Sequence, residues 1–583
     1  MAIYETQYAL DVDRGNTWSI SEVDQDQVDS FCDQFSLKRP IIKSLLLKGI
    51  DADAAEDFLR PSLDLLSNPF RLPDMKKAVD RIWLARENNE KVIIHGDYDT
   101  DGVTSAVLLE WVLLAYGVKA EVFVSNRMED GYGPTGSTVE KAKLRGASLI
   151  ISTDCGITSF EACEKATELG MQIIVTDHHN PGVDLPAAYA IVNPRLSPEL
   201  IDLHGLAGVG VAFKVCHAFI KSSYSKDFAQ PDIDLRYGLD LVALGTVADV
   251  SPMTGENRCL IKNGMKLLEV RQRPAVDALC EISYVEGRVT GNDISRRLAP
   301  KINAAGRVGD PMVSVELFKS KDKQSALKSA YVLDRFNKQR RKAERSAFDE
   351  AIEAARFELG RDNRGGLVVS GDGWHPGIIG LLATKVSKHF SRPTIILCYD
   401  ETSGELLGSG RSCAQLDILS VLAANSHLLG SFGGHPMAVG VSLRKENLAE
   451  FRDIFVGAFC NVDMESASRS EENLFADDEM MFCEVDDSLM DELEALEPFG
   501  NGNKEPIYFF RKSRVCQIYA LGESHCRGVL EDDSGIRVPF ICYSISEKLF
   551  PRGDLSLMAS PRRVSVKGVV EVQLFIVDVK AYE

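Results

Sequence analysis

The segment "KVIIHGDYDTDG", residues 91–102, places one histidine and three aspartates directly after a run of apolar residues. His95, Asp97 and Asp99 are spaced two positions apart, so an extended backbone would carry all three side chains on one side. Carboxylates and imidazoles bind metal ions and exchange protons with substrates. One strand that ends in aspartate is common, because aspartate favours turns, so the interpretation depends on the neighbouring strands.

Two further apolar runs end in the same residue types. "LIISTDCG" ends in Asp154, and "QIIVTDHHNPG" ends in Asp177, which His178 and His179 follow. A fourth acid, Asp249, follows the apolar stretch "LVALGTVADV". Because the carboxyl ends of parallel strands meet at one edge of a sheet, where ligands bind, we expect these side chains to crowd together.

Crowded carboxylates repel one another unless they take up protons or bind a cation, and no lysine stands at these strand ends. Aspartate-rich ligand sets with a few imidazoles suit Mn²⁺ or Mg²⁺ better than zinc alone. We therefore expect a site for two metal ions. Such a pair activates a water molecule and holds the oxygens of an in-line displacement, which suits phosphodiester hydrolysis. The sequence has no G-x-S-x-G elbow and no P-loop, which argues against a covalent serine nucleophile and a nucleotide-driven motor.

The elements around these residues indicate an α/β unit. Short β-rich runs alternate with helical patterns between residues 90 and 195, which favours a mostly parallel sheet. The predicted strands are "KVIIHG", "AEVFVS", "SLIIST", "QIIVTD" and "YAIVNP". A largely helical stretch follows, over residues 206–300. Residues 320–358 lack Pro and Gly and predict one long exposed helix. Its "KQRRKAER" is interpreted first as a solvated helix face and second as a phosphate contact.

The rest of the chain predicts further domains. A second α/β pattern occupies residues 365–460, and short β-rich runs from residue 505 suit a five-stranded barrel such as an OB-fold. The predicted strands of this barrel are "KSRVCQIYAL", "HCRGVLE", "IRVPFICYS", "RVSVKGVVE" and "VQLFIVDVKAY". The expected division is an N-terminal extension (1–75), a first α/β domain (76–318), a connecting helix (319–360), a second α/β domain (361–462), an acidic linker and helix (463–504) and the barrel (505–583).

Composition narrows the class of protein. The chain has 583 residues, of which 45% are hydrophobic and 26% charged, and it contains no apolar run of membrane-spanning length and no secretory signal at its start. Thirteen scattered cysteines without a C-x-x-C pair suggest reduced thiols in a cytoplasm. The net charge is −20, but residues 463–497 carry −13 of it. A local basic groove is compatible with the remainder.

The motifs resemble a known family. "DHH" at 177–179, "HGDYDTDG" and "STDCG" are similar to motifs of the DHH phosphoesterase superfamily, and "GGHPMAVG" at 433–440 is similar to its DHHA1 companion domain. "FLRPSLDLLSNPFRLPDM", "NRMEDGYGP", "INAAGRVGDP", "WHPGIIG" and "EPFGNGN" resemble motifs of the RecJ exonuclease family within it. This resemblance covers nearly the whole chain. One departure is Thr100, where the family more often has alanine.

The resemblance implies roles for the residues at the strand ends. It implies two metal sites, formed by His95 and Asp97 for one ion, by Asp99, His178 and Asp249 for the other, and by Asp154 as the bridge between them. His179 is then left to face the substrate phosphate. The alternative for His179 is a buried histidine with a structural role. Asp177 would fix an imidazole from behind, and Asp101 would be a supporting residue. His179, Asp154 and Asp177 are the expected catalytic residues.

Substrate contacts are expected on glycine-rich segments. Arg307 in "NAAGRVGD" and Arg411 in "GSGRS" stand among small residues, where a phosphate can approach backbone N–H groups while a guanidinium binds it. A loop salt bridge is the alternative for each arginine, and the resemblance favours the substrate. Gly433, Gly434 and His435 offer a similar close approach. Two weaker candidates share "NRMEDGYGP", namely Arg127 and Tyr132.

Three functions are compatible with these motifs. The resemblance implies a single-stranded-DNA-specific exonuclease that digests from the 5′ end to mononucleotides, in recombination and repair. It also implies a partnership with single-strand-binding protein, and we expect a monomer with no membrane contact. The first alternative is a phosphodiesterase of small nucleotides, which would need neither this length nor a barrel. The second is a non-catalytic DNA-binding replication factor, which should have lost metal ligands, whereas every ligand position here is intact.

Overall fold

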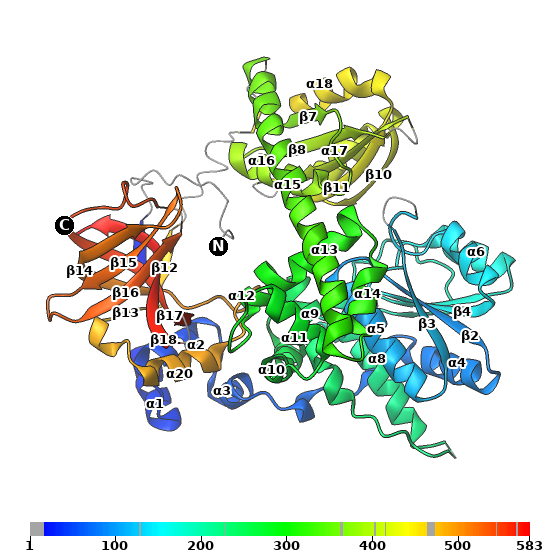
Figure 1. The fold of residues 1–583 in the computed structure, drawn as a ribbon, viewed down its shortest axis with the longest axis horizontal. Helices are drawn as coiled ribbons and strands as arrows, with labels where there is room; N and C mark the ends of the chain where they lie inside the picture. The colour runs from blue at the N-terminus through cyan, green and yellow to red at the C-terminus, as the bar shows by residue number, and fades with distance from the viewer. Residues whose placement is uncertain are drawn as a thin grey trace.

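The computed structural model describes residues 17–126, 130–226, 228–361, 365–400, 404–413, 416–462, 473–543, 545–566 and 569–582. Two α/β units are joined by a long helix, and a β-barrel lies on the other side of a helical centre (Figure 1). Within these ranges, no helix is both long and apolar enough to cross a membrane.

The first α/β unit confirms the predicted parallel sheet. Its strand order is β3-β2-β4-β5-β6, and all pairs are parallel. The strands are β2 (Lys91–Gly96), β3 (Lys119–Val124), β4 (Ala147–Thr153), β5 (Gln172–Thr176) and β6 (Ala190–Val192). Val92, Ile93 and Ile94 are all buried, because helices cover both faces of a parallel sheet.

Helices on the two faces form separate apolar cores. On one face lie α4 (Met75–Glu87), α5 (Thr100–Ala115) and α8 (Gly208–Ser223). On the other face lie α6 (Gly136–Leu144) and α7 (Phe160–Glu168). The expected helical stretch follows, as α9 (Leu239–Ala248), α10 (Gly255–Val270), α11 (Pro274–Ile282), α12 (Gly291–Asp293), α13 (Ala299–Val308) and α14 (Met312–Phe318).

The predicted long helix is α15 (Lys323–Arg361), with 39 residues. It packs against α11, α13 and α14 near its start and against the second α/β unit near its end. In its basic stretch, Arg340 pairs with Glu344 at 3.2 Å over one helical turn, but both side chains are largely buried, so this pair does not lie on a solvated face. Lys342 and Arg345 are exposed.

The second α/β unit has a mixed sheet in the order β10-β11-β9-β8-β7. Only β7 and β8 are parallel to each other. Its strands are β7 (Leu367–Gly371), β8 (Thr394–Tyr399), β9 (Leu406–Arg411), β10 (Leu429–His435) and β11 (Ala438–Leu443). The helix α16 (Ile379–Phe390) packs with α15 on one face, and α17 (Ile418–Ala424) and α18 (Leu448–Ala458) cover the other.

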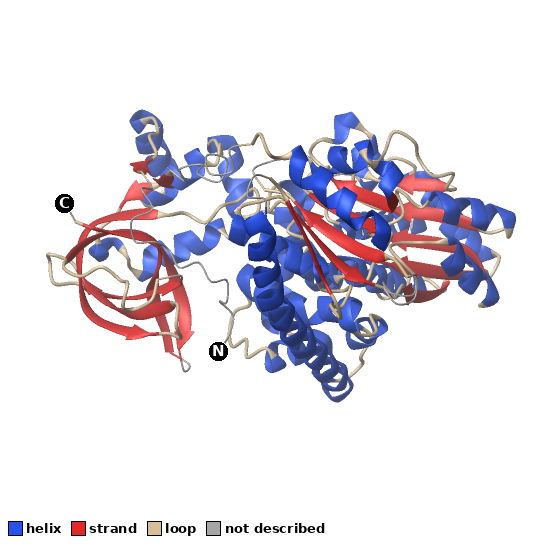
Figure 2. Cartoon of the chain, turned by 90° about the horizontal axis from the view of Figure 1, so that it is seen from above, coloured by secondary structure: helices blue, strands red, loops and turns tan. Residues whose placement is uncertain are grey.

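The C-terminal strands close into the predicted five-stranded barrel, in the order β14-β15-β16-β18-β17 with β17 paired back to β14 (Figure 2). The strands are β14 (Tyr508–Ala520), β15 (His525–Glu531), β16 (Arg537–Tyr543), β17 (Asp554–Val566) and β18 (Val569–Ala581). The prediction of "RVSVKGVVE" as one strand is wrong, because this run crosses the hairpin between β17 and β18. Apolar and polar residues alternate on both sides of Lys567 and Gly568, which lie outside the described residues. This alternation gives no sign in the sequence of where one strand ends and the next begins.

The N-terminal helices belong to the barrel side of the molecule. α1 (Gln25–Phe35), α2 (Arg39–Leu47), α3 (Ala52–Leu59) and α20 (Asp487–Leu496) share one apolar core with the barrel. Short strands complete this part: β1 (Trp18–Ile20) pairs with β12 (Leu474–Ala476), and β13 (Asp478–Glu479) extends the barrel sheet. From α10, Arg258 donates to Phe58 O and Leu496 O at 2.9 and 3.0 Å. These cation contacts at the ends of α3 and α20 join the barrel side to the helical centre.

Candidate active site

The aspartates that follow three neighbouring strands lie level at the carboxyl edge of the first sheet. The backbone N–H of Asp97 donates to Thr153 O at 3.3 Å, and that of Asp154 donates to Thr176 O at 3.0 Å. Asp177 follows Thr176 directly, so all three carboxylates leave the sheet at the same height. The register of the parallel strands therefore brings together residues that are up to eighty positions apart in the sequence.

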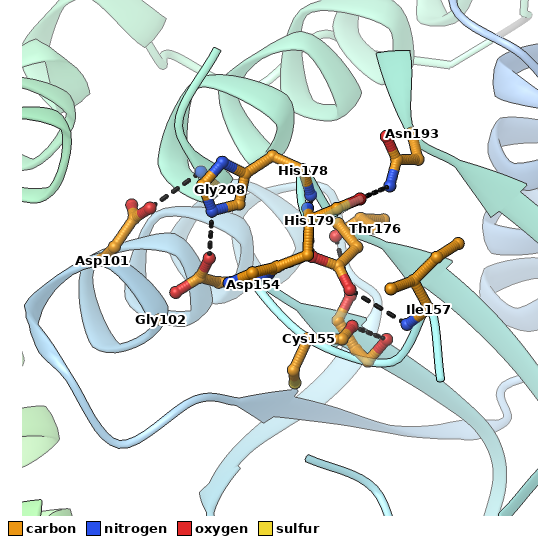
Figure 3. Close-up of polar contacts among 12 residues, drawn as sticks. Asp101, Gly102, Asp154, Cys155, Ile157, Thr176, His178, His179, Asn193 and Gly208 are labelled. Atoms are coloured by element: carbon orange, nitrogen blue, oxygen red, sulfur yellow. Dashed lines mark hydrogen bonds and ion pairs between the residues drawn. The ribbon is translucent and has the colours of Figure 1, made fainter. Parts of the chain in front are cut away.

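The loop after β2 places two more acids beside this row. Asp99 caps α5, and its carboxylate accepts from the Gly102 N–H at 3.0 Å. Asp101, in the first turn of α5, accepts from the backbone N–H groups of Gly208 and Val209, at 2.8 Å each. These N–H groups open α8, and the positive end of the helix dipole favours a negative charge there. Figure 3 shows the carboxylate of Asp101 turned toward Gly208.

The helices α8 and α13 pack closely against the loops that carry the aspartates. A Cβ on Gly208 would lie 2.5 Å from Asp154 Oδ1, so only glycine lets the start of α8 come this near. Asn303 on α13 accepts from the backbone N–H and the hydroxyl of Thr100, at 2.8 and 2.6 Å. Thr100 thus has a structural contact that an alanine would lack. A Cβ on Gly306 of the same helix would lie 2.8 Å from Tyr98 O, so α13 presses directly on the loop.

Asp249 reaches the cluster from the end of α9. It caps the helix, and Ser251 Oγ donates to its Oδ2. The residue between them, Val250, has φ +64°, and Asp154 has φ +61°. A left-handed backbone at a residue other than glycine costs of order 1–3 kcal/mol and persists only where the surroundings enforce it. Two residues of this site therefore carry local backbone strain.

The structure brings the predicted donors into three overlapping groups. Within each group the nearest nitrogen or carboxylate oxygen atoms lie within 4.8 Å of one another, counted over the described residues. The groups are Asp97, Asp99 and Asp154; Asp101, His178 and Asp249; and Asp154, His178 and His179. Asp154 belongs to two of them and His178 to two. Asp101, expected only to support, is a full member of one.

Burial makes this collection of negative charges costly. Burial raises the pKa of Asp154 well above its usual value, and the charges of four neighbouring aspartates add to this effect. For Asp101 the pKa is raised well above its usual value by burial first and then by the charges of Asp249 and Asp99. The pKa of Asp99 is raised for the same two kinds of reason. Each of these side chains is disfavoured as a carboxylate unless positive charge joins it.

The donor set fits a pair of divalent cations. His178 Nε2 lies 3.1 Å from Asp154 Oδ1 (Figure 3), yet neither atom has a hydrogen-bond partner of good geometry among the described residues. Burial lowers the pKa of His178, so its neutral ring offers a lone pair rather than a charge. Buried oxygens and neutral imidazole nitrogens that face one another are what Mn²⁺ or Mg²⁺ would neutralise.

His95 lies apart from the three groups. Its Nε2 is 2.7 Å from Ser125 Oγ, and its Nδ1 is 3.9 Å from Cys155 Sγ. Burial lowers the pKa of His95 to about 4, so the ring is neutral at ordinary pH and can act as a ligand. Its membership of a metal site stays a prediction.

His179 is held by Asp177 as expected for a supporting carboxylate. Asp177 Oδ1 accepts from His179 Nδ1 at 2.8 Å and from the His179 backbone N–H at 3.1 Å, while Oδ2 accepts from Ile157 N–H at 2.9 Å. Burial lowers the pKa of His179, but the hydrogen bond and the charge of Asp177 outweigh it and raise the pKa to about 9. The ring of Tyr132 lies 6.3 Å from that of His179, centroid to centroid. Tyr132 is therefore beside the cluster, and its contact with a substrate stays a prediction.

The other predicted substrate residues lie on the second α/β unit or beside it. Arg307 Nη1 donates to Gly377 O of "WHPGIIG" at 3.3 Å, so this arginine joins the two units. Arg411, at the end of β9, donates to Gly410 O at 2.7 Å. Gly433, Gly434 and His435 lie on the exposed edge strand β10. Arg127 lies outside the described residues.

Sequence reasoning missed two supporting residues. Asn303 stands in the quoted motif "INAAGRVGDP", and its role as an acceptor for the start of α5 was not foreseen. Ser251 has no motif around it, and only its distance of two residues from Asp249 could have indicated a contact.

Three segments of the chain match known families. Residues 91–246 match the DHH family, N-terminal domain, residues 363–459 match the DHHA1 domain, and residues 476–578 match the RecJ OB domain. The single-stranded-DNA-specific exonuclease RecJ of Dickeya dadantii is 34% identical over 87% of this chain and 90% of that protein. The RecJ of Bacillus subtilis is also 34% identical, over 89% of this chain, but the match spans only 64% of that longer protein.

A solved structure agrees with the sequence comparisons. The crystal structure of RecJ in complex with Mn²⁺ from Thermus thermophilus superposes with a TM-score of 0.79 at 24% identity, over 97% of this chain and 80% of that chain. The fold and the matched domains place the chain in the DHH family. Within that class, the chain belongs to the RecJ family.

The contact between α13 and the acidic loop gives a first prediction. Gly306→Ala should lower phosphodiesterase turnover at least tenfold, because its Cβ would push the Tyr98 backbone and with it the carboxylates on either side, and misplacements of about 1 Å can cost 10²-fold. The measurement is steady-state turnover of a single-stranded oligonucleotide with Mn²⁺. The control is Gly360→Ala on α15, whose Cβ would meet nothing within 4 Å. Equal turnover in both variants would contradict the account.

The crowding of carboxylates gives a second prediction. Asp154→Asn removes a charge but keeps the shape, and asparagine tolerates the left-handed backbone as well as aspartate does. In strong chelator the variant should melt about 2–4 °C above wild type, the shift that about 1 kcal/mol produces in a domain of this size. With Mn²⁺ the order should reverse, because the metal stabilises only a protein that binds it. A lower melting temperature of the variant in chelator would refute the repulsion.

Proposed function

We propose that this chain is a single-stranded-DNA-specific exonuclease that hydrolyses phosphodiester bonds with two divalent cations, Mn²⁺ or Mg²⁺, and releases mononucleotides from the 5′ end. The observation that carries the proposal is the convergence of aspartates and histidines in three overlapping donor groups at one sheet edge. Curated relatives that are named single-stranded-DNA-specific exonucleases support the choice of substrate and reaction.

The proposed ligands come from the segments after the strands of the first sheet and from the end of α9. His95 and Asp97 would hold one ion, Asp99, His178 and Asp249 the other, and Asp154 would bridge them. When bound, two cations supply a water of lowered pKa and neutralise charge on the phosphate oxygens. The carboxylates of this chain would fix the positions of the two cations. The contacts of Asp101 and Asp99 with the starts of helices α8 and α5 keep the loop after β2 from moving apart under the repulsion between the carboxylates.

His179 is proposed to contact the phosphate that is cut. Asp177 accepts from its Nδ1, which leaves Nε2 to face the substrate. An imidazolium in this orientation donates from Nε2 to a phosphate oxygen, and the carboxylate behind it fixes the ring. Tyr132 lies beside the same ring and would limit the room for the terminal nucleotide.

Arg307, Arg411 and His435 are proposed to bind the DNA strand. The first joins the two α/β units, and the other two stand on the sheet of the second unit. Gly433 and Gly434 would let a phosphate approach the backbone of β10. Arg127 remains a proposal from the sequence alone.

A groove supports a long polymer as the substrate. It has a volume of about 2380 Å³ and lies between the loop after α11, the helices α15 and α16, and the barrel. None of the proposed metal ligands lines it, so it can hold only a part of the substrate away from the cut. Small-molecule sites are typically about 300–1,000 Å³, so the first alternative, a small-nucleotide phosphodiesterase, leaves this groove without a use.

The charge of this groove opposes that of the whole chain. Eleven arginine or lysine residues and eight acidic residues line it, although the chain as a whole carries −20. Lys342, Arg345 and Lys388 are exposed there and form no ion pair with any residue that the structure describes. Aromatic residues on the barrel wall lie among the cations: Arg562 stands over the Phe575 ring at 4.2 Å. Such a surface suits the backbone and the bases of a single strand.

Further parts of the proposal come from the family and the sequence. Roles in recombination and repair, a single-strand-binding protein as partner, a monomeric state and a cytoplasmic location are proposed on this basis. All thirteen cysteines are free thiols, as expected for a reducing compartment. The domain limits 1–75, 76–318, 319–360, 361–462, 463–504 and 505–583 remain proposals from the sequence, and in the structure helices of the first and fifth segments share one apolar core with the barrel.

Polarity is the third prediction. With Mn²⁺, a single-stranded oligonucleotide labelled at its 5′ end should release the label first, as a mononucleotide. The same strand labelled at its 3′ end should shorten stepwise and keep its label until last. Blunt duplex of the same sequence should resist. Preferential loss of the 3′ label, or equal digestion of duplex, would overturn the proposed function.

Groove binding is the fourth prediction. Replacing Lys342, Arg345 and Lys388 together by alanine should weaken binding of a long single strand and leave turnover of a trinucleotide unchanged within about twofold. Each lost phosphate contact should reduce the slope of log affinity against log salt by about 0.7, and therefore by about 2 in total. Affinity is measured by fluorescence anisotropy in chelator over a salt series.

The matched control removes the same charge elsewhere. Lys76, Lys119 and Lys143 lie on the first α/β unit and do not line the groove. Their triple alanine variant should keep both the affinity and the salt slope of wild type. If the two triple variants behave alike, the groove does not bind the strand and only overall charge matters.

A further inference from the structure

One loop of the barrel side reaches the segment that follows Asp249. The loop Phe499–Asn503, here called the Asn501 loop, belongs to "EPFGNGN" between α20 and the barrel. Asn501 O accepts from the Met253 N–H at 2.7 Å, and Asn501 Nδ2 donates to Val250 O at 3.2 Å. A single residue thus holds both ends of the segment from Val250 to Met253, although it is about 250 positions away in the sequence.

The segment it holds carries strain and touches a proposed metal ligand. Val250 has φ +64°, which a β-branched residue avoids, and its side chain is 62% exposed, so little packing of that side chain supports the conformation. The next residue, Ser251, donates to Asp249 Oδ2. Relaxation of Val250 would therefore move the hydroxyl that orients Asp249.

The Asn501 loop is itself firmly held. Gly500 and Asn503 exchange backbone hydrogen bonds at 2.9 and 3.1 Å, which closes a tight turn around Asn501. The buried amide of Asn503 donates to Leu496 O and Pro498 O, at 2.9 and 2.8 Å. Phe499 packs against the apolar core that the barrel shares with α20. The loop can therefore act as a fixed support for a strained segment.

We propose that Asn501 is a positioning residue for Asp249: it fixes the backbone from Val250 to Met253, and through Ser251 it aims the carboxylate of Asp249 at the metal site. The barrel side of the molecule thereby completes a site that lies in the first α/β unit. This inference rests on the proposed function, in which Asp249 is a metal ligand.

Manganese titration of the full chain tests the inference without DNA. Asn501→Ala removes the side-chain donor to Val250 but keeps the backbone contact to Met253. Calorimetry with MnCl₂ should show two sites, one with wild-type affinity and one about tenfold weaker, the lower range for a residue that supports a ligand from behind. Electron paramagnetic resonance of the bound Mn²⁺ gives an independent count. In activity assays, kcat should recover at high Mn²⁺ while KM for the oligonucleotide stays at the wild-type value.

The control variant changes a residue that contacts the chain next to the Asn501 loop. Lys48 Nζ donates to Lys504 O, directly after the Asn501 loop, and not to the segment after Asp249. Lys48→Ala should bind both manganese ions as wild type does. Ser251→Ala should weaken the same site as Asn501→Ala, and the double variant should be no weaker than the stronger single effect, because both changes act through one path.

Two outcomes separate the inference from the function on which it rests. If Asp249→Asn loses a manganese ion while Asn501→Ala binds both at wild-type affinity, the positioning role is wrong and the proposed function stands. If Asp249→Asn itself binds two ions at wild-type affinity, Asp249 is no ligand, and both the inference and that part of the proposed metal site are wrong. Equal weakening of both sites in Asn501→Ala would also overturn the inference, because it would indicate general loosening.

Discussion

Repulsion between buried carboxylates at the edge of one parallel sheet is the constraint on which the rest of the structure depends. The strands β2, β4 and β5 are in register, so Asp97, Asp154 and Asp177 cannot avoid one another. Asp177 is satisfied by hydrogen bonds and keeps a lowered pKa despite its burial. Asp154 Oδ1 has no hydrogen-bond partner among the described residues, and burial holds the pKa of Asp154 well above its usual value. A fold that gathers these groups is stable at neutral pH only with protons or cations among them.

Most of the surrounding architecture keeps this arrangement from relaxing. The start of α8 binds Asp101 and approaches Asp154, α13 presses on Tyr98, and the Asn501 loop holds the segment after Asp249. These supports come from three different regions of the chain. All three use glycine or asparagine, which permit close approach or bind backbone groups. The long helix and the barrel line a separate groove with more basic than acidic side chains.

The sequence predicted the elements that depend on local periodicity and could not predict contacts between distant segments. The five strands of the first sheet and the single helix α15 follow from apolar patterns and from the absence of Pro and Gly. The same pattern failed between β17 and β18, where alternation runs through a hairpin. Asn303 and Asn501 belong to motifs that the sequence analysis quoted, but neither motif indicates which residue the asparagine contacts. The site itself could be predicted, because the ends of neighbouring parallel strands lie side by side at one edge of the sheet.

Neutralisation of the acidic cluster by two cations can be tested in a crystal. Its most direct test is anomalous diffraction at the manganese edge from crystals of the full chain soaked in MnCl₂. We expect two peaks about 3.5–4 Å apart, with Asp154 in contact with both and Asp249 and His178 at one of them. A single peak, or two peaks that do not share Asp154, would contradict it.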